Sequence, residues 1–274
     1  MSLDLDALRR LIPATPAGPP TDASLWLDIE HGNTFDGHAE LRRTSAFLCL
    51  HPGEVKTLVI LCRPSTNDNS TYLLTRQFWG SLFNAGAHVL GLQDRSGLYF
   101  SAGVPALAPS LAGSIRWVTQ LVQALGVDTV VTAGSSAGAP GALTFAAGLG
   151  AQRCLLFSPV TSVEEPFYAR RADRTSADDT VSRRWKRLQP QIPVDRQFCG
   201  ARLLKAMAKP AELRVHYPDR RYWDREWAEL LGDAPGVTLV PHETAEHALL
   251  DRHSLKSALA TAEVHGFLLG KPAT

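Results

Sequence analysis

The strongest constraint on the fold of this chain is a series of six short apolar runs separated by stretches long enough to form helices. In the first run, residues 57–62, apolar residues follow one another without polar alternation, as in strands that are buried on both faces. Strands that alternate with helices predict an α/β fold, in which a parallel sheet is covered by helices on both faces. The expected strands are 57–62, 87–92, 128–134, 153–157, 212–217 and 237–240, and the expected helices are 71–85, 109–125, 137–149, 224–232 and 249–269.

The residues before this pattern predict an addition to the sheet. Segments 24–31 and 38–50 alternate apolar and polar residues, which indicates an antiparallel hairpin along one edge of the sheet. Residues 1–20 combine a short helical stretch with a Pro-rich tether. We therefore expect an N-terminal helix and tether over 1–20 and one domain over 21–274, because 274 residues provide one sizeable core.

A long insertion, about residues 160–209, interrupts the strand–helix alternation. Its part from 164 to 209 contains eleven Lys or Arg and six Asp or Glu, a local charge of +5 that leaves −4 for the rest of the chain. Such a run is usually a solvated helix face. The same charge would also attract an anionic substrate if the insertion covers a binding site.

Composition excludes several classes of protein. The net charge of +1 lacks the basic excess of a nucleic-acid binder, and no segment is long and apolar enough for a membrane span. The sequence has no phosphate-binding Gly-rich loop and no metal-ligand spacing, so we expect no cofactor and no metal. It also lacks an apolar signal-peptide core, and its four cysteines form no CxxC pair, which favours a reducing, cytoplasmic location.

One motif carries specific chemistry. Residues 134–138, Gly-Ser-Ser-Ala-Gly, match G-x-S-x-G and stand directly between an expected strand and an expected helix. This is the context of a nucleophile elbow, a strained turn that raises a serine hydroxyl above the sheet. The two glycines allow neighbouring backbone to approach, and the N–H of Ala137 is placed to bind an oxyanion. We therefore predict Ser136 as the nucleophile. The alternative is a tight strand-to-helix turn without a catalytic role, which could have the same five residues.

The order strand, Gly-Ser-Ser-Ala-Gly, helix, strand, insertion, strand, acid, strand, histidine resembles the α/β-hydrolase family over roughly residues 45–270. This resemblance implies an eight-stranded, mostly parallel sheet, a Ser–acid–His triad in that order, and a cap formed by the insertion. The short stretches Asp94-Arg95 and Phe157-Ser158-Pro159 are also similar to a branch that includes bacterial glycan-modifying proteins and O-acetyltransferases of accessory secretion systems.

The resemblance implies that the catalytic base follows the last strand, 237–240, where three histidines stand. His247 lies one loop past the strand, at the position expected for the family. His242 is close to the strand end, and His253 falls within the expected last helix. We favour His247 as the base.

The triad acid is expected in the loop after the strand 212–217, where Asp219 and Asp224 compete. Asp219 has a spacing that is common in the family, whereas Asp224 stands four residues before Ala228, as in the glycan-modifying branch. Without a catalytic role, Asp219 would form a turn and Asp224 would cap a helix. We favour Asp224 and keep Asp219 as the alternative.

Three further positions belong to the expected site. The second oxyanion donor should come from the loop after the first central strand, where Ser65 or Thr66 would donate because Pro64 has no N–H. Arg95 either binds an anionic substrate group or forms a structural ion pair with Asp94, which we favour. Tyr99 is a candidate for the lining of an acyl pocket.

These residues predict a serine hydrolase or acyltransferase that acts on an ester or thioester. The expected substrate is a small acyl compound, including anionic or carrier-bound ones, and the expected reaction proceeds through an acyl-enzyme. The alternative is a non-catalytic binding protein of the same fold, because the His-Gly that many hydrolases carry after the first central strand is absent here.

Overall fold

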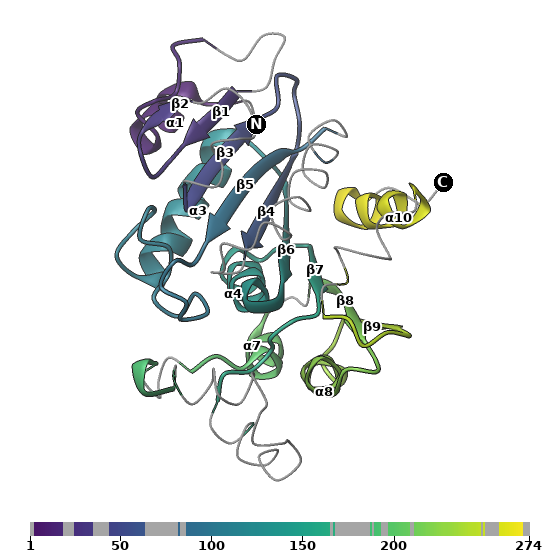
Figure 1. Ribbon diagram of the computed structural model, residues 1–274. Helices are drawn as coiled ribbons and strands as arrows, with labels where there is room; N and C mark the ends of the chain where they lie inside the picture. Colours follow the sequence, from purple (N-terminus) through teal and green to yellow (C-terminus); the bar gives the residue numbers. More distant parts are fainter. Residues whose placement is uncertain are drawn as a thin grey trace.

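Figure 1 shows the computed structural model, in which one mixed sheet runs through the middle of the molecule. The structure describes residues 3–18, 25–34, 44–63, 82, 86–164, 167, 187, 189–192, 197–208, 211–247, 249 and 258–270. Most of the charged insertion and the expected helix 71–85, apart from Leu82, lie outside these ranges.

The sheet has nine strands in the order β2-β1-β3-β5-β4-β6-β7-β8-β9. From β5 to β9 all neighbours pair in parallel, whereas β1 pairs antiparallel with β2 and β3, and β3 pairs antiparallel with β5. The strands are β1 (Leu25–Asp28), β2 (Asn33–Thr34), β3 (Ala46–Leu50), β4 (Thr57–Arg63), β5 (His88–Gln93), β6 (Thr129–Ser135), β7 (Arg153–Phe157), β8 (Glu212–Pro218) and β9 (Val237–His242).

The predicted α/β architecture with antiparallel edge strands is confirmed. All six expected central strands are present as β4 to β9, and the expected hairpin is present as β1 and β3. The resemblance implies eight strands, and the sheet has one more, β2, whose two residues pair with Leu27 and Asp28 of β1.

The described helices lie on both faces of the sheet (Figure 1). They are α1 (Leu5–Leu11), α3 (Leu111–Leu125), α4 (Ala139–Leu149), α7 (Gly200–Ala206), α8 (Tyr222–Glu229) and α10 (Ala258–Leu269), with short 3₁₀ turns η2 (Ser136–Gly138) and η4 (Gln189–Gln191). Helices α1, α3 and α4 contribute to the larger buried cluster on one face, and Val264, Phe267 and Leu268 of α10 pack on the opposite face.

Local sequence explains where the two long helices on the first face begin and end. The Ser110 side chain caps α3 by accepting a hydrogen bond from Gly113 N at 3.2 Å. Both α3 and α4 end at a glycine in the left-handed region, Gly126 with φ 63° and Gly150 with φ 64°. These stops bring the chain back to the sheet, so that β6 and β7 can pair in parallel.

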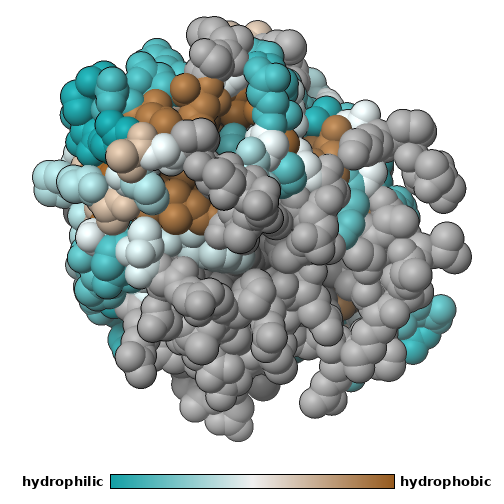
Figure 2. Space-filling model, turned by 90° about the horizontal axis from the view of Figure 1, so that it is seen from above, coloured by the Kyte–Doolittle hydropathy of each residue, from teal (hydrophilic) through white to brown (hydrophobic). Residues whose placement is uncertain are grey.

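The surface and the cysteines complete this description. Among the described helices, none is both long and apolar enough to cross a membrane. Figure 2 looks onto the molecule from above and shows apolar side chains gathered between hydrophilic ones on the left. Cys49, Cys62 and Cys154 are buried, Cys199 is half-buried, and all four are free thiols.

Candidate active site

The Gly-Ser-Ser-Ala-Gly segment forms the sharp strand-to-helix turn that the sequence predicts. Strand β6 ends at Ser135, the 3₁₀ turn η2 begins at Ser136, and α4 follows from Ala139. Ser136 has φ 49°, a left-handed conformation that a residue with a side chain adopts only at a cost of about 1–3 kcal/mol. Its carbonyl accepts a hydrogen bond from Val160 N at 3.1 Å, which ties the turn to the segment after β7.

The two glycines of the motif stand where neighbouring backbone leaves no room for a side chain. A Cβ on Gly138 would lie 2.1 Å from the carbonyl oxygen of Cys62 in β4, and one on Gly134 would lie 2.7 Å from Gly138 O. The turn is therefore wedged against the carboxyl end of β4. This close approach is the physical reason for glycine at both positions.

Replacing Gly138 by alanine is expected to lower the free energy of unfolding by about 1–3 kcal/mol, because the new methyl group forces β4 and the elbow apart. Urea unfolding followed by circular dichroism measures this change. Gly18→Ala is the matched control, because a Cβ there meets nothing within 4 Å. Equal unfolding midpoints for the two variants would contradict the close contact.

The structure joins Ser136, His247 and Asp224 in one hydrogen-bonded chain. Nε2 of His247 lies 2.8 Å from Oγ of Ser136, and Nδ1 of His247 lies 2.7 Å from Oδ1 of Asp224. Because a carboxylate only accepts hydrogen bonds, the Nδ1–H of His247 donates to it, and Nε2 is left to accept from the Ser136 hydroxyl. The three residues come from the elbow, from the loop after β9 and from α8.

Asp224 and Asp219, the two candidates for the acid, have different surroundings. Asp224 is fully buried in the first turn of α8, which begins at Tyr222, and not at the helix cap that a structural role would imply. Its second oxygen, Oδ2, forms a 2.7 Å ion pair with Nε of Arg221. Asp219 is half-buried, and its backbone N–H donates to His242 O at 3.0 Å. The structure therefore places Asp224, and not Asp219, against His247.

The other candidate histidines form no described hydrogen bond with Ser136 or Asp224. His242 Nε2 lies 3.0 Å from Nδ1 of His216 on β8, and the His216 ring stacks on Phe157. Burial, followed by the nearby His242 and Arg214, lowers the pKa of His216 to about 3, so its ring is neutral at ordinary pH. Burial also lowers the pKa of His242. His253 lies outside the described residues.

The sequence analysis gave no role to two residues that contact the hydrogen-bonded series of Ser136, His247 and Asp224. Ser158 follows β7 with φ 42°, and its hydroxyl donates to the carbonyl of His247. Arg221 is the ion-pair partner of Asp224. The sequence signal for Arg221 was a basic residue three positions before an acid at the start of an expected helix. The contact from Ser158 joins residues 89 positions apart, and no local pattern indicates it.

The remaining predicted site residues are partly described. Ala137 is buried directly after Ser136, so its N–H belongs to the first turn of η2. Ser65 and Thr66, the expected second oxyanion donors, lie outside the described residues. Their contribution stays a prediction.

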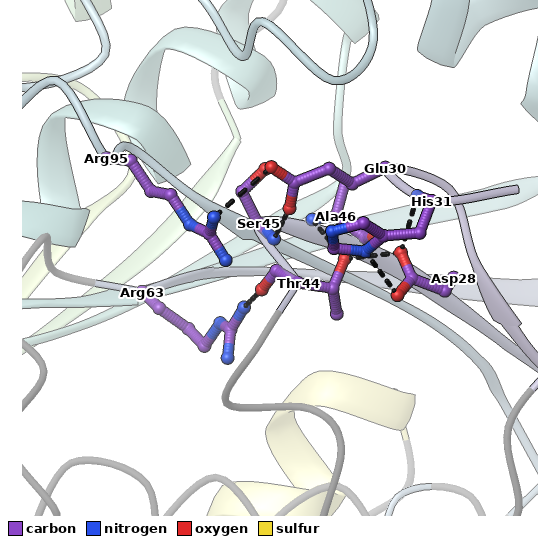
Figure 3. Close-up of polar contacts among 8 residues, drawn as sticks. All are labelled: Asp28, Glu30, His31, Thr44, Ser45, Ala46, Arg63 and Arg95. Carbon is purple, nitrogen blue, oxygen red and sulfur yellow. Dashed lines mark hydrogen bonds and ion pairs between the residues drawn. The ribbon is translucent and has the colours of Figure 1, made fainter.

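Arg95 takes part in a polar network at the carboxyl ends of β1, β4 and β5 (Figure 3). Its Nη1 lies 3.2 Å from Oε1 of Glu30. The Asp94 carboxylate instead accepts hydrogen bonds from Ser96 and from Phe100 N. The described ion pair of Arg95 is therefore with Glu30. The expectation that its ion-pair partner is Asp94 was wrong. Binding of a substrate anion by Arg95 stays a prediction.

Tyr99 belongs to an aromatic cluster beside the elbow. With φ 56°, it follows the Asp94 turn and is buried together with Ala137 of the elbow. Phe167 stacks on Trp227 with ring centroids 6.3 Å apart and an angle of 8°. The cluster therefore includes Ala137, the residue that directly follows the hydrogen-bonded serine. Its buried members are Tyr99, Ala137, Val160, Val163, Phe167, Ile192, Trp223 and Trp227.

Among the described residues, no group of three or more His, Cys, Asp or Glu side chains could hold a metal ion.

The nine-stranded sheet, the elbow after β6 and the Ser–Asp–His chain order together define the α/β-hydrolase fold. Solved structures support this assignment. Esterase B of Lactobacillus rhamnosis matches with a TM-score of 0.55 and 14% identity, over 97% of this chain and 93% of that chain. Esterase 2 of Thermogutta terrifontis matches with a TM-score of 0.54 and 15% identity, over 86% and 92%.

Carboxyl esterase 2 of Tuber melanosporum matches with a TM-score of 0.52 and 14% identity, over 82% of this chain and 78% of that chain. No protein-family model and no curated protein matches the sequence. At these identities the shared property is the fold.

Proposed function

We propose that the protein is a serine ester hydrolase that works through an acyl-enzyme on Ser136. The observation that carries this proposal is the chain of two hydrogen bonds from Ser136 through His247 to Asp224, set on a strained elbow. A serine hydroxyl is a weak nucleophile and requires such a base. The half-buried imidazole and the fully buried carboxylate provide it.

In the proposed first step, Oγ of Ser136 attacks the ester carbonyl while Nε2 of His247 takes the hydroxyl proton. Asp224 keeps the imidazole in the tautomer with the proton on Nδ1 and stabilises the imidazolium. The N–H of Ala137 binds the developing oxyanion, with Ser65 or Thr66 as the second donor. His247 then gives its proton to the leaving alcohol, and the acyl group stays on Ser136.

In the second step, water attacks the acyl-enzyme with His247 again as the base, which releases the acid and restores the serine. An alcohol in place of water would give acyl transfer by the same residues. The fold neighbours support ester chemistry, since the three proteins compared above are esterases, one of them solved with butyrate bound.

Two features favour a substrate class, the aromatic cluster beside the elbow and the charge of the segment 164–209. The aromatic cluster beside the elbow favours a small apolar acyl group, because these side chains are buried and apolar. The local charge of +5 on residues 164–209 favours substrates that carry a negative charge elsewhere in the molecule.

Two p-nitrophenyl esters of equal chain length test both parts of this proposal. We expect saturable hydrolysis of p-nitrophenyl butyrate and of the monoester of succinate, with the preference for the anionic succinate ester falling as salt is added. A salt-independent ratio would refute the electrostatic part alone. If the protein hydrolyses neither ester and no longer or shorter homologue of them, the non-catalytic binding protein would be favoured instead.

A further inference from the structure

Arg221 forms an ion pair with the carboxylate that contacts His247. It is the N-cap residue of α8, and its Nε lies 2.7 Å from Oδ2 of Asp224, three residues further along. The other oxygen of the same carboxylate, Oδ1, accepts from Nδ1 of His247. The two oxygens of Asp224 therefore serve two different partners, one on its own helix and one on the loop after β9.

The burial of Asp224 makes the second contact important. The Asp224 side chain is 0% exposed, whereas that of Arg221 is 43% exposed, so the carboxylate exchanges water for these two partners while the guanidinium keeps part of its hydration. A buried carboxylate without a counter-charge is costly. It would also be free to turn about its side-chain torsions and offer the wrong oxygen geometry to His247.

We propose that Arg221 is a positioning residue for the reaction proposed above: its guanidinium holds Oδ2 and thereby aims Oδ1 at His247. The inference rests on the proposed function, because it concerns the acid of the same triad. The contact is a close ion pair without the angles of a hydrogen bond, so charge, more than donor geometry, carries it. A lysine at this position should therefore restore part of the effect.

The chain contains a matched control in the preceding residue. Arg220 has the same side chain and pairs with Glu243, but that pair is exposed, with side-chain exposures of 61% and 77%. Removing Arg220 deletes one surface charge from the same turn and leaves Asp224 untouched. Exposed pairs of this kind contribute little to stability.

The experiment compares Arg221→Gln, Arg221→Lys and Arg220→Gln in the full chain, with p-nitrophenyl butyrate as substrate. For Arg221→Gln we expect kcat to fall about 10-fold with KM nearly unchanged, because the lost contact acts on the base and not on substrate binding. Arg221→Lys should recover part of kcat, and Arg220→Gln should match the wild type. Circular dichroism and thermal melting check that each variant is folded.

A double-mutant cycle separates positioning from a general loss of structure. In an Asp224→Asn background, Arg221→Gln should have no further effect on kcat, because its target carboxylate is gone. The inference is overturned if Arg220→Gln and Arg221→Gln lower kcat equally, or if the two Arg221 and Asp224 effects are additive. Complete inactivity of the wild type toward esters would instead count against the proposed function.

Discussion

Ser136→Ala is expected to lower kcat/KM for p-nitrophenyl butyrate by at least about 10⁴-fold, because it removes the atom that forms the acyl-enzyme. The residual rate would come from the oxyanion donors and from substrate binding. Initial rates over a range of substrate concentrations measure the loss. Alanine also adds no backbone strain that serine does not already have at this position, so the variant should stay folded.

Ser135→Ala is the matched control for this prediction. Ser135 is the last residue of β6 and directly precedes Ser136, but His247 contacts Ser136 and not Ser135 in the hydrogen-bonded chain. We expect Ser135→Ala to retain activity close to that of the wild type. Equal losses in the two serine variants would show that the damage is to the elbow and that Ser136 is not the nucleophile.

Asp224→Asn is expected to lower kcat about 10³- to 10⁴-fold with little change in volume, because an amide can donate to His247 and favours the wrong tautomer. Asp219→Asn is expected to have little effect, since Asp219 lies against His242 and not against His247. Steady-state kinetics of the two variants side by side measure the difference.

The opposite result for these two variants would contradict the assignment of Asp224 as the acid. If Asp219→Asn abolishes turnover and Asp224→Asn does not, the assignment of the acid is wrong. In that case the 2.7 Å contact between Asp224 and His247 would be structural only.

Much of the architecture was predictable because buried strands leave a clear signal in the sequence. The run Leu58–Cys62 is apolar throughout and lies in β4, which stands between β5 and β6 in the sheet and is buried along almost its whole length. The elbow was also predictable, because the Gly-Ser-Ser-Ala-Gly motif of residues 134–138 stands directly between an expected strand and an expected helix. Both features are local, and local features are what a single sequence encodes most directly.

Contacts between distant residues were harder to predict. The pairing of Arg95 with Glu30 depends on β1 and β5 ending at the same edge of the sheet, with β3 between them. The choice of Asp224 over Asp219 depends on α8 beginning at Tyr222, two residues before the expected start, which turns Asp224 from a cap into a buried first-turn residue. Helix ends shift by such amounts through tertiary packing, which propensity alone does not determine.

The central claim is that Ser136 is an activated nucleophile, and active-site labelling tests it most directly. The wild type and Ser136→Ala are each treated with a fluorophosphonate, and the intact mass and the labelled peptide are determined. We predict one adduct per chain, located on Ser136, and none on the Ser136→Ala variant. Folded wild-type protein that remains unlabelled, or that is labelled at another residue, would contradict the claim.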